Sequence, residues 1–162
     1  MRWVPMERSD LPAVTALADA IHVNYPEDEA VLEERLRLYP EGCLVARNGD
    51  VCRGYAIAHP WKRGAPPALN SLLGAIPADA DIFYMHDVAI APAQAKSGFG
   101  RAVVEIFKRQ AVAKGFALIG LVSVNNSAAY WQRHGFRRVD SDALRRALQS
   151  YGGDAAYMEC AL

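Results

Sequence analysis

The segment APAQAKSGFGRAVV, residues 91–104, places two glycines and two basic side chains where one hydrophobic pattern gives way to another. Gly98 and Gly100 follow an apolar run typical of a strand and precede an apolar spacing typical of a helix, with Lys96 and Arg101 beside them. Glycines at such a junction let successive backbone N–H groups point into one concavity, where the helix dipole adds about half a positive charge. The segment is a candidate anion site, although a tight turn can use glycine for steric reasons alone.

Two familiar phosphate loops do not fit this segment. No Gly-Lys-Ser/Thr follows it, which excludes a Walker A loop, and the three-glycine pattern of dinucleotide-binding folds is missing. The surrounding elements must therefore decide between a phosphate site and a turn.

Length and composition indicate one soluble domain, residues 1–162, with a single core. The 18 lysine and arginine residues balance the 18 acidic ones, so the chain lacks the excess of positive charge that is typical of nucleic-acid-binding proteins. The odd cysteine count without CxxC spacing argues against a disulfide framework and for a reducing compartment. No apolar run approaches the ~20 residues of a membrane span, and no signal peptide is evident. We expect a cytoplasmic protein without a nucleic-acid, membrane or metal partner.

Hydrophobic periodicity predicts the element order β-α-α-β-β-β-α-β-α-β-(α)-β, an α/β protein with a mixed sheet and helices on both faces. The expected features along the chain are a strand at 1–6, a helix capped by Ser9, a helix at 27–40, a hairpin around Asn48-Gly49, a long loop at 61–81 with a short helix near 69–76, a strand at 82–90, a helix at 98–114, a strand at 116–124, a helix at 126–135, and strands at 137–140 and 155–161 flanking a last helix.

HDVAIAPAQAKSGFGRAVVEIF followed by LVSVNNSAAYWQRHGF resembles the GNAT family of acyl-CoA-dependent N-acyltransferases. The shared pattern is a strand, a glycine-rich turn and a helix, then a strand, a polar helix start, an aromatic residue and Gly-Phe. With the element order, the resemblance covers nearly the whole chain. It implies the GNAT fold, a mostly antiparallel sheet of about seven strands, splayed between the fourth and fifth strands near Val88 and Val124.

The resemblance also implies acetyl-CoA as cosubstrate, an amine acceptor, and no metal. Backbone groups of the fourth strand would pair with the pantetheine arm, namely those of Val88, Ala89 and Ile90. Amides of the turn would wrap the pyrophosphate, contributed by Ala95, Lys96, Ser97, Gly98, Phe99, Gly100 and Arg101. Asn126 and Ser127 would cap the next helix or touch the cofactor arm. Attack of the amine would be direct, on a thioester polarised by backbone N–H near Val88, with no cysteine intermediate.

Two departures from the family pattern stand out. Ala95-Lys96 replaces the usual Arg or Gln followed by glycine, which puts the pyrophosphate turn in doubt. Trp131 occupies the position where many members place the tyrosine that protonates the leaving thiolate, and we group it with the cofactor-binding residues. Tyr130 is the remaining candidate acid, but a shift of one residue turns it about 100° around the helix, and it can equally be core.

Acetyl transfer requires removal of a proton from the amine, for which a carboxylate or an imidazole is suited. His86 and Asp87 are the catalytic candidates on the fourth strand, and because adjacent strand residues face opposite sides, only one should face the cleft unless a bulge intervenes. Asp87 is favoured slightly, although a structural hydrogen-bonded pair fits as well. His22, Tyr25 and Glu27 are candidates for acceptor binding, although a helix end with acidic residues also explains them.

Three functions remain open at this point. The first is an N-acetyltransferase acting on the primary amine of a small molecule, which the lid-like segment 61–81 favours. The second is a degenerate GNAT domain that binds acyl-CoA as a sensor, and the third is an acetyltransferase of protein N-termini or lysines. A homodimer is compatible with the sequence.

Overall fold

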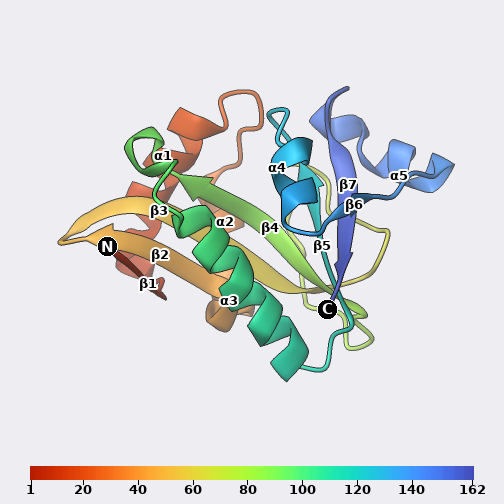
Figure 1. The fold of residues 1–162 in the computed structure, drawn as a ribbon, viewed down its shortest axis with the longest axis horizontal. Coiled ribbons are helices and arrows are strands. Elements are labelled where there is room, and N and C mark those ends of the chain that lie inside the picture. The colour runs from red at the N-terminus through yellow and green to blue at the C-terminus, as the bar shows by residue number, and fades with distance from the viewer.

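Seven strands form one mixed sheet, in the order β1-β2-β3-β4-β5-β7-β6, in the computed structural model, which describes all 162 residues (Figure 1). The strands are β1 (Arg2–Pro5), β2 (Cys43–Asn48), β3 (Val51–Trp61), β4 (Ile82–Ile90), β5 (Leu118–Ser123), β6 (Arg137–Arg138) and β7 (Ala156–Ala161). The α-helices are α1 (Leu11–Ile21), α2 (Glu29–Leu38), α3 (Phe99–Ala113), α4 (Ala128–Arg133) and α5 (Asp142–Ala147). All neighbouring strands are antiparallel except β4 and β5, which confirms the expected GNAT-type sheet.

The sheet separates two apolar cores because alternate strand residues face opposite sides. On one face α1 and α2 pack on β2, β3 and β4, with Val14, Leu32 and Tyr55 in this core. On the other face α3 and α4 cover the sheet, with Phe107 and Trp131 in the larger core. Figure 1 shows α3 lying across that second face. The predicted placement of helices on both faces is confirmed.

Two irregularities of β4 create space for a site. Parallel pairing with β5 covers only Phe83–Met85 of β4, although the strand continues to Ile90, so the two strands diverge beyond Met85. A register shift against β3 pairs Ile57 with Asp87 but Ala58 with Met85, which leaves His86 as the extra residue of a β-bulge. The predicted splay between the fourth and fifth strands is thereby confirmed.

Two local predictions are wrong. Ser9 does not cap the first helix, because residues Arg8–Asp10 form a 3-10 turn that leads into α1, and the residue before that turn is Glu7. No helix forms at 69–76, where Asn70 has a positive φ of 55° and hydrogen bonds to other elements replace a helical ladder. The hairpin around Asn48-Gly49 is confirmed, with Asn48 opposite Val51. No helix in the structure has the length and hydropathy that crossing a membrane requires.

Candidate active site

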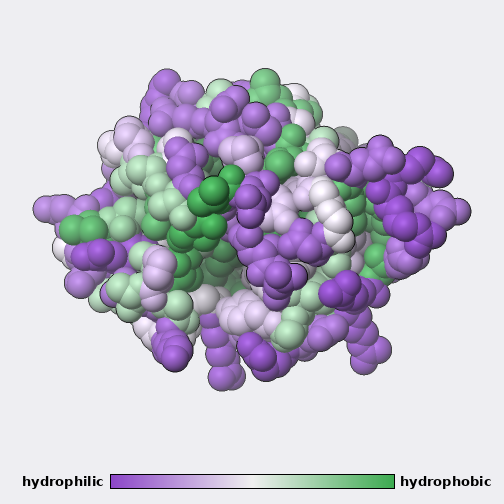
Figure 2. All heavy atoms as spheres, turned by 90° about the horizontal axis from the view of Figure 1, so that it is seen from above, coloured by the Kyte–Doolittle hydropathy of each residue, from purple (hydrophilic) through white to green (hydrophobic).

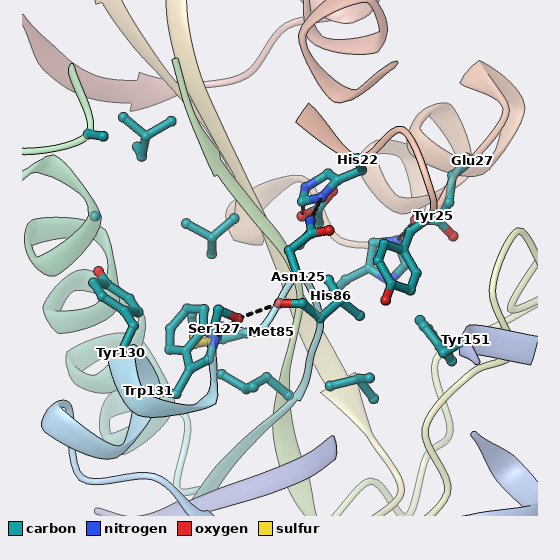
Figure 3. A pocket seen from close by; sticks show the side chains of 18 of the residues that line it. His22, Tyr25, Glu27, Met85, His86, Asn125, Ser127, Tyr130, Trp131 and Tyr151 are labelled. Carbon is teal, nitrogen blue, oxygen red and sulfur yellow. Dashed lines mark hydrogen bonds and ion pairs between the residues drawn. The ribbon is translucent and has the colours of Figure 1, made fainter. Parts of the chain in front are cut away.

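A cavity of about 370 Å³ lies where β4 and β5 diverge. It is lined by His22, Tyr25, Glu27, Leu69, Met85, His86, Asp87, Val88, Ile90, Ala95, Lys96, Gly98, Gly100, Arg101, Leu121, Val122, Val124, Asn125, Ser127, Tyr130, Trp131 and Tyr151. Seen from above Figure 1, apolar side chains gather in the middle of this side of the molecule between polar ones (Figure 2). In the close-up, Tyr130 and Trp131 lie at one end, whereas Tyr25, Glu27 and Tyr151 lie at the other (Figure 3).

The cavity brings together most of the residues singled out in the sequence. All six candidates for catalysis and acceptor binding line it, together with nine of the predicted cofactor residues. The side chains of four do not: Ala89 is buried in the core beneath α1, Ser97 bonds to Gln94 O, and Phe99 and Asn126 point elsewhere. The backbone of these four stays next to lining residues, because each is adjacent to one in the chain.

The first end of the cavity is formed by the start of α3 and carries positive charge. Gly98 has a φ of 82°, a conformation that L side chains rarely adopt, and it turns the chain into α3. The first N–H groups of this 15-residue helix have no partner within it. Lys96 and Arg101 line the same end, and neither has a carboxylate within ion-pair distance. This end is suited to an anion.

Tyr130 and Trp131 occupy different places around that end. A methyl group added at Gly100 would lie 2.7 Å from the hydroxyl oxygen of Tyr130, so this hydroxyl sits against the first turn of α3. Burial raises the pKa of Tyr130. Trp131 is largely buried, and its Nε1 donates to Ser127 Oγ at 3.1 Å. Ser127 in turn donates to Val124 O at 2.7 Å and makes no capping bond to α4, so the predicted cap is wrong.

His22 and Asp87 form the first of two imidazole–carboxylate pairs in the middle of the cavity. His22 Nε2 lies 2.9 Å from Asp87 Oδ1, and the Tyr55 hydroxyl donates to Asp87 Oδ2. Burial raises the pKa of Asp87, but His22, Tyr55 and His86 outweigh it, so the pKa is lowered. Burial lowers the pKa of His22, but Asp87 and then Glu27 outweigh it, so the pKa is raised above 6.5.

The contact with Asp87 fixes which nitrogen of His22 carries the proton in the neutral ring. A carboxylate oxygen next to Nε2 requires a proton there, so Nδ1 keeps its lone pair. Nδ1 lies 3.2 Å from the side-chain nitrogen of Asn125, which can donate to it. His22 and Asn125 both line the cavity, so a ligand there can compete with the Asn125 amide for this nitrogen.

His86 and Glu27 form the second pair. His86 Nε2 lies 2.8 Å from Glu27 Oε1, and the His86 side chain is only 2% exposed. Burial raises the pKa of Glu27, but His86 and a bond from the Asn70 N–H outweigh it and lower the pKa. Adjacent residues of a regular strand face opposite sides of the sheet. The bulge at His86 breaks this alternation and explains why His86 and Asp87 both line the cavity.

Residues 67–74, here called the wall segment, border the second end of the cavity, which Leu69 lines. Hydrogen bonds anchor it from three sides: Tyr151 Oη to Pro67 O, Leu69 N to Ser150 Oγ, Asn70 N to Glu27 Oε2, Arg35 Nη2 to Ser71 O, and the N–H groups of Leu73 and Gly74 to the Glu34 carboxylate. Arg35 and Glu34 themselves form a buried ion pair of 2.7 Å. The wall segment is thus a fixed part of the site.

Several lining residues were not anticipated from the sequence, chiefly Leu69, Asn125 and Tyr151. Asn125 has a φ of 53° just after β5, and only its place beside the predicted polar helix start hinted at a role. Leu69 and Tyr151 belong to a loop and to a 3-10 turn far apart in the chain, and no motif includes them.

The cysteines lie away from the site. None lines the cavity, and burial raises the pKa of the Cys43 thiol to about 12. No cluster of three or more His, Cys, Asp or Glu side chains has the arrangement of a metal site.

Comparisons with known proteins agree with this architecture. The sequence profile of the Acetyltransferase (GNAT) family matches residues 11–136. No curated protein matches the sequence.

Solved structures resemble the chain over its whole length. The GphF GNAT-like decarboxylase in complex with isobutyryl-CoA has a TM-score of 0.80 at 18% identity, covering 99% of both chains. The loading GNATL domain of CurA from Lyngbya majuscula has a TM-score of 0.78 at 12% identity, covering 99% of this chain and 96% of that one. N-acetylglutamate synthase from Neisseria gonorrhoeae, complexed with coenzyme A and N-acetyl-glutamate, has a TM-score of 0.75 at 15% identity. The match covers 99% of this chain and 35% of that one. At these identities the likeness is one of fold.

Proposed function

The chain belongs to the Acetyltransferase (GNAT) family, and from that membership we propose that it transfers an acetyl group from acetyl-CoA directly to the primary amine of a small molecule. The observation that carries the proposal is that one cavity has a cationic end at α3 and, from its middle to its second end, two imidazole–carboxylate pairs. The first end suits the phosphates of a cofactor, and the second suits an amine that must lose a proton.

The cofactor would lie in the gap between β4 and β5. Beyond Met85 the edge of β4 that faces β5 has no strand partner, so its backbone groups are available to the pantetheine arm. The N-terminal amides of α3, with Lys96 and Arg101, would hold the pyrophosphate. Proteins of this fold have been solved with CoA or isobutyryl-CoA bound, which supports a CoA cosubstrate. Because the 370 Å³ cavity must also admit the acceptor, a short acyl group fits best.

We assign the role of general base to His22. Both oxygens of Asp87 are engaged, one by His22 and the other by Tyr55, so Asp87 acts as a positioning residue rather than as the base. His86 has one nitrogen against Glu27 and the other enclosed without a partner. His22 is the more exposed of the two imidazoles, at 13% against 2%, and its Nδ1 meets only the neutral amide of Asn125, which an incoming amine would displace.

The reaction then proceeds in one displacement. The amine nitrogen attacks the thioester carbonyl carbon, the new C–N bond forms as the C–S bond breaks, and His22 Nδ1 takes the amine proton. Backbone N–H groups of β4 near Val88 would stabilise the oxyanion. The released thiolate takes a proton from water, and His22 returns the amine proton to the resulting hydroxide, so that no net proton is gained or lost. No cysteine lines the cavity, so a covalent route through a cysteine thiolate has no nucleophile there.

A small acceptor is favoured because the wall segment is held in place. A protein substrate needs an open groove, whereas residues 67–74 border this end and are held by bonds to α2, to Glu27 and to the turn containing Tyr151. The same observation weighs against transfer to a protein N-terminus or lysine.

The test of the proposed function is release of CoA thiol from acetyl-CoA in the presence of a panel of primary amines, with the acetylated product identified by mass spectrometry. Turnover with at least one small amine is expected. Tight CoA binding without thiol release for any amine or peptide would instead indicate an acyl-CoA sensor.

The pH dependence of kcat should show an acidic limb with its inflection above pH 6.5. His22 must be neutral to accept a proton, and its pKa is raised by Asp87 and Glu27. Asp87→Asn removes the larger of these charges while burial remains, so its inflection should move to lower pH. The measurement is kcat between pH 5 and 9 for both proteins. An inflection that does not move would remove His22 from this role.

Lys96→Ala should weaken CoA binding by about 5- to 10-fold at low salt, because it removes a charge-assisted contact to phosphate. The difference between variant and native protein should shrink at 1 M salt, where the Debye length falls to about 3 Å. Calorimetric titration with CoA at two salt concentrations measures both effects. Arg109→Ala, an exposed position on α3 outside this cavity, is the matched control and should bind as the native protein does.

A further inference from the structure

We propose that the acceptor carries no carboxylate on the carbon that bears its amine, so that the substrate is an amine or an amino-acid amide rather than a free α-amino acid. The inference rests on the proposed function and specifies the substrate class of the same site. Its basis is the set of charged groups and hydrogen-bond donors at the second end of the cavity.

The charged groups at the second end of the cavity disfavour a carboxylate on the acceptor. Glu27 and Asp87 are both carboxylates, and their pKa values are lowered, by His86 and by His22 respectively, so both are ionised at neutral pH. The only basic side chains among the residues lining this end are the two imidazoles, and each already faces a carboxylate. A substrate carboxylate placed next to the amine would therefore meet two negative charges.

No other cation reaches the second end. Lys96 and Arg101 line the opposite end, beside α3. Arg35 lies behind the wall segment with a side chain that is 0% exposed, held by Glu34 and by Ser71 O. It cannot contact a ligand without breaking a buried ion pair.

The neutral donors at this end are also engaged. The N–H of Leu69 donates to Ser150 Oγ, and the N–H of Asn70 donates to Glu27. The hydroxyl groups of the two tyrosines in this wall donate to protein acceptors, Tyr25 to Asp154 and Tyr151 to Pro67 O. An incoming carboxylate would find no basic side chain without a carboxylate partner and no free donor among these wall residues, and an unpaired buried anion is strongly disfavoured.

What the second end does offer is apolar surface and rings. Leu69 lies in the wall, Tyr25 lies beside Glu27 in the close-up (Figure 3), and Tyr151 also lines the cavity. A neutral substituent on the amine-bearing carbon can pack here, while the amine itself approaches the imidazole–carboxylate pairs.

The experiment compares three acceptors that differ only in this substituent: 2-phenylethylamine, phenylalaninamide and phenylalanine, with an aliphatic set (ethylamine, alaninamide, alanine) run in parallel. Thiol release from acetyl-CoA gives kcat/KM, and calorimetry on the CoA-bound protein gives affinity without turnover. The amide should lie within a few-fold of the amine, whereas the free acid should be about 10- to 100-fold poorer in both measurements.

The amide separates charge from bulk, because it has nearly the shape of the acid but no charge. An amide as poor as the acid, or an acid as good as the amide, would overturn the inference. Absence of thiol release for every acceptor, with the affinity ranking preserved, would overturn the proposed reaction and leave the charge selectivity standing. Absence of binding by all six compounds would overturn the inference as well.

A pair of variants tests the source of the selectivity. Glu27→Gln should reduce the preference for the amide over the acid by about fivefold, because it removes one of the two repelling charges. Asp28→Asn makes the same change of charge one residue further on, outside the cavity, and should leave the preference unchanged. An equal preference in native protein and Glu27→Gln would mean that Glu27 does not exclude the carboxylate.

Discussion

Replacing His22 with glutamine should lower kcat by about 10²- to 10³-fold, within the range that a positioned general base contributes. Glutamine is of similar size and keeps a polar atom near Asp87, but it cannot take a proton from the amine. The affinity for CoA should change little, because the cofactor end of the cavity lies at α3. Steady-state kinetics and a CoA titration measure the two quantities separately.

The double variant with Asp87→Asn distinguishes catalysis from a general disturbance of the site. Asp87 acts through His22, so Asp87→Asn should be costly alone but should add almost nothing to His22→Gln. If the double variant lost kcat by the product of the two single reductions, another group would be shown to accept the proton. A His22→Gln enzyme within threefold of the native kcat would show the same. His86→Gln should cost less than His22→Gln, since His86 is enclosed.

Gly100→Pro should abolish measurable CoA binding, an increase in the dissociation constant of about 100-fold or more. Gly100 is the second residue of α3, and its N–H is one of the helix-start donors that have no internal partner. Proline removes this donor, disfavours the helical conformation of Phe99 before it, and places carbon atoms where the Tyr130 hydroxyl lies. Calorimetric titration with CoA is the measurement, with circular dichroism to verify the fold.

Gly100→Ala is the matched control for this prediction. Its methyl group meets the same Tyr130 oxygen at 2.7 Å, but the N–H remains. It should therefore weaken CoA binding clearly less than proline does. A folded Gly100→Pro variant with native affinity would remove the start of α3 from the phosphate site.

The order of elements and the turn that starts α3 could be predicted because their signals are local, whereas the cofactor role of this turn came from the family resemblance. Gly98 and Gly100 fall at a change from strand to helix periodicity, and the hairpin follows from Asn48-Gly49 between apolar alternations. The splay between β4 and β5 came from the family resemblance, since nothing in the periodicity of either strand states where their pairing stops.

The wall at the second end of the cavity could not be predicted, although Tyr25 and Glu27 were, because long-range contacts decide where this wall lies. The apolar spacing around Leu69 suggested a helix, but Glu34 and Arg35 capture the backbone of the wall segment instead. Tyr151 reaches this wall from the opposite end of the chain, through its bond to Pro67 O. Tertiary bonds of this kind override local propensity and leave no periodic trace in a sequence.

The bulge at His86 makes the length of β4 as constrained as its composition. Phe83 and Met85 face α3 before the bulge, whereas Val88 does so after it, so the strand changes phase at one residue. An insertion or deletion between the bulge and Ile90 would exchange the two faces of the remaining strand, turning Asp87 or Ala89 from the α1 side to the α3 side. Descendants of this sequence can therefore vary the acceptor site by substitution in β4, but changes of strand length here would dismantle the core and the site together.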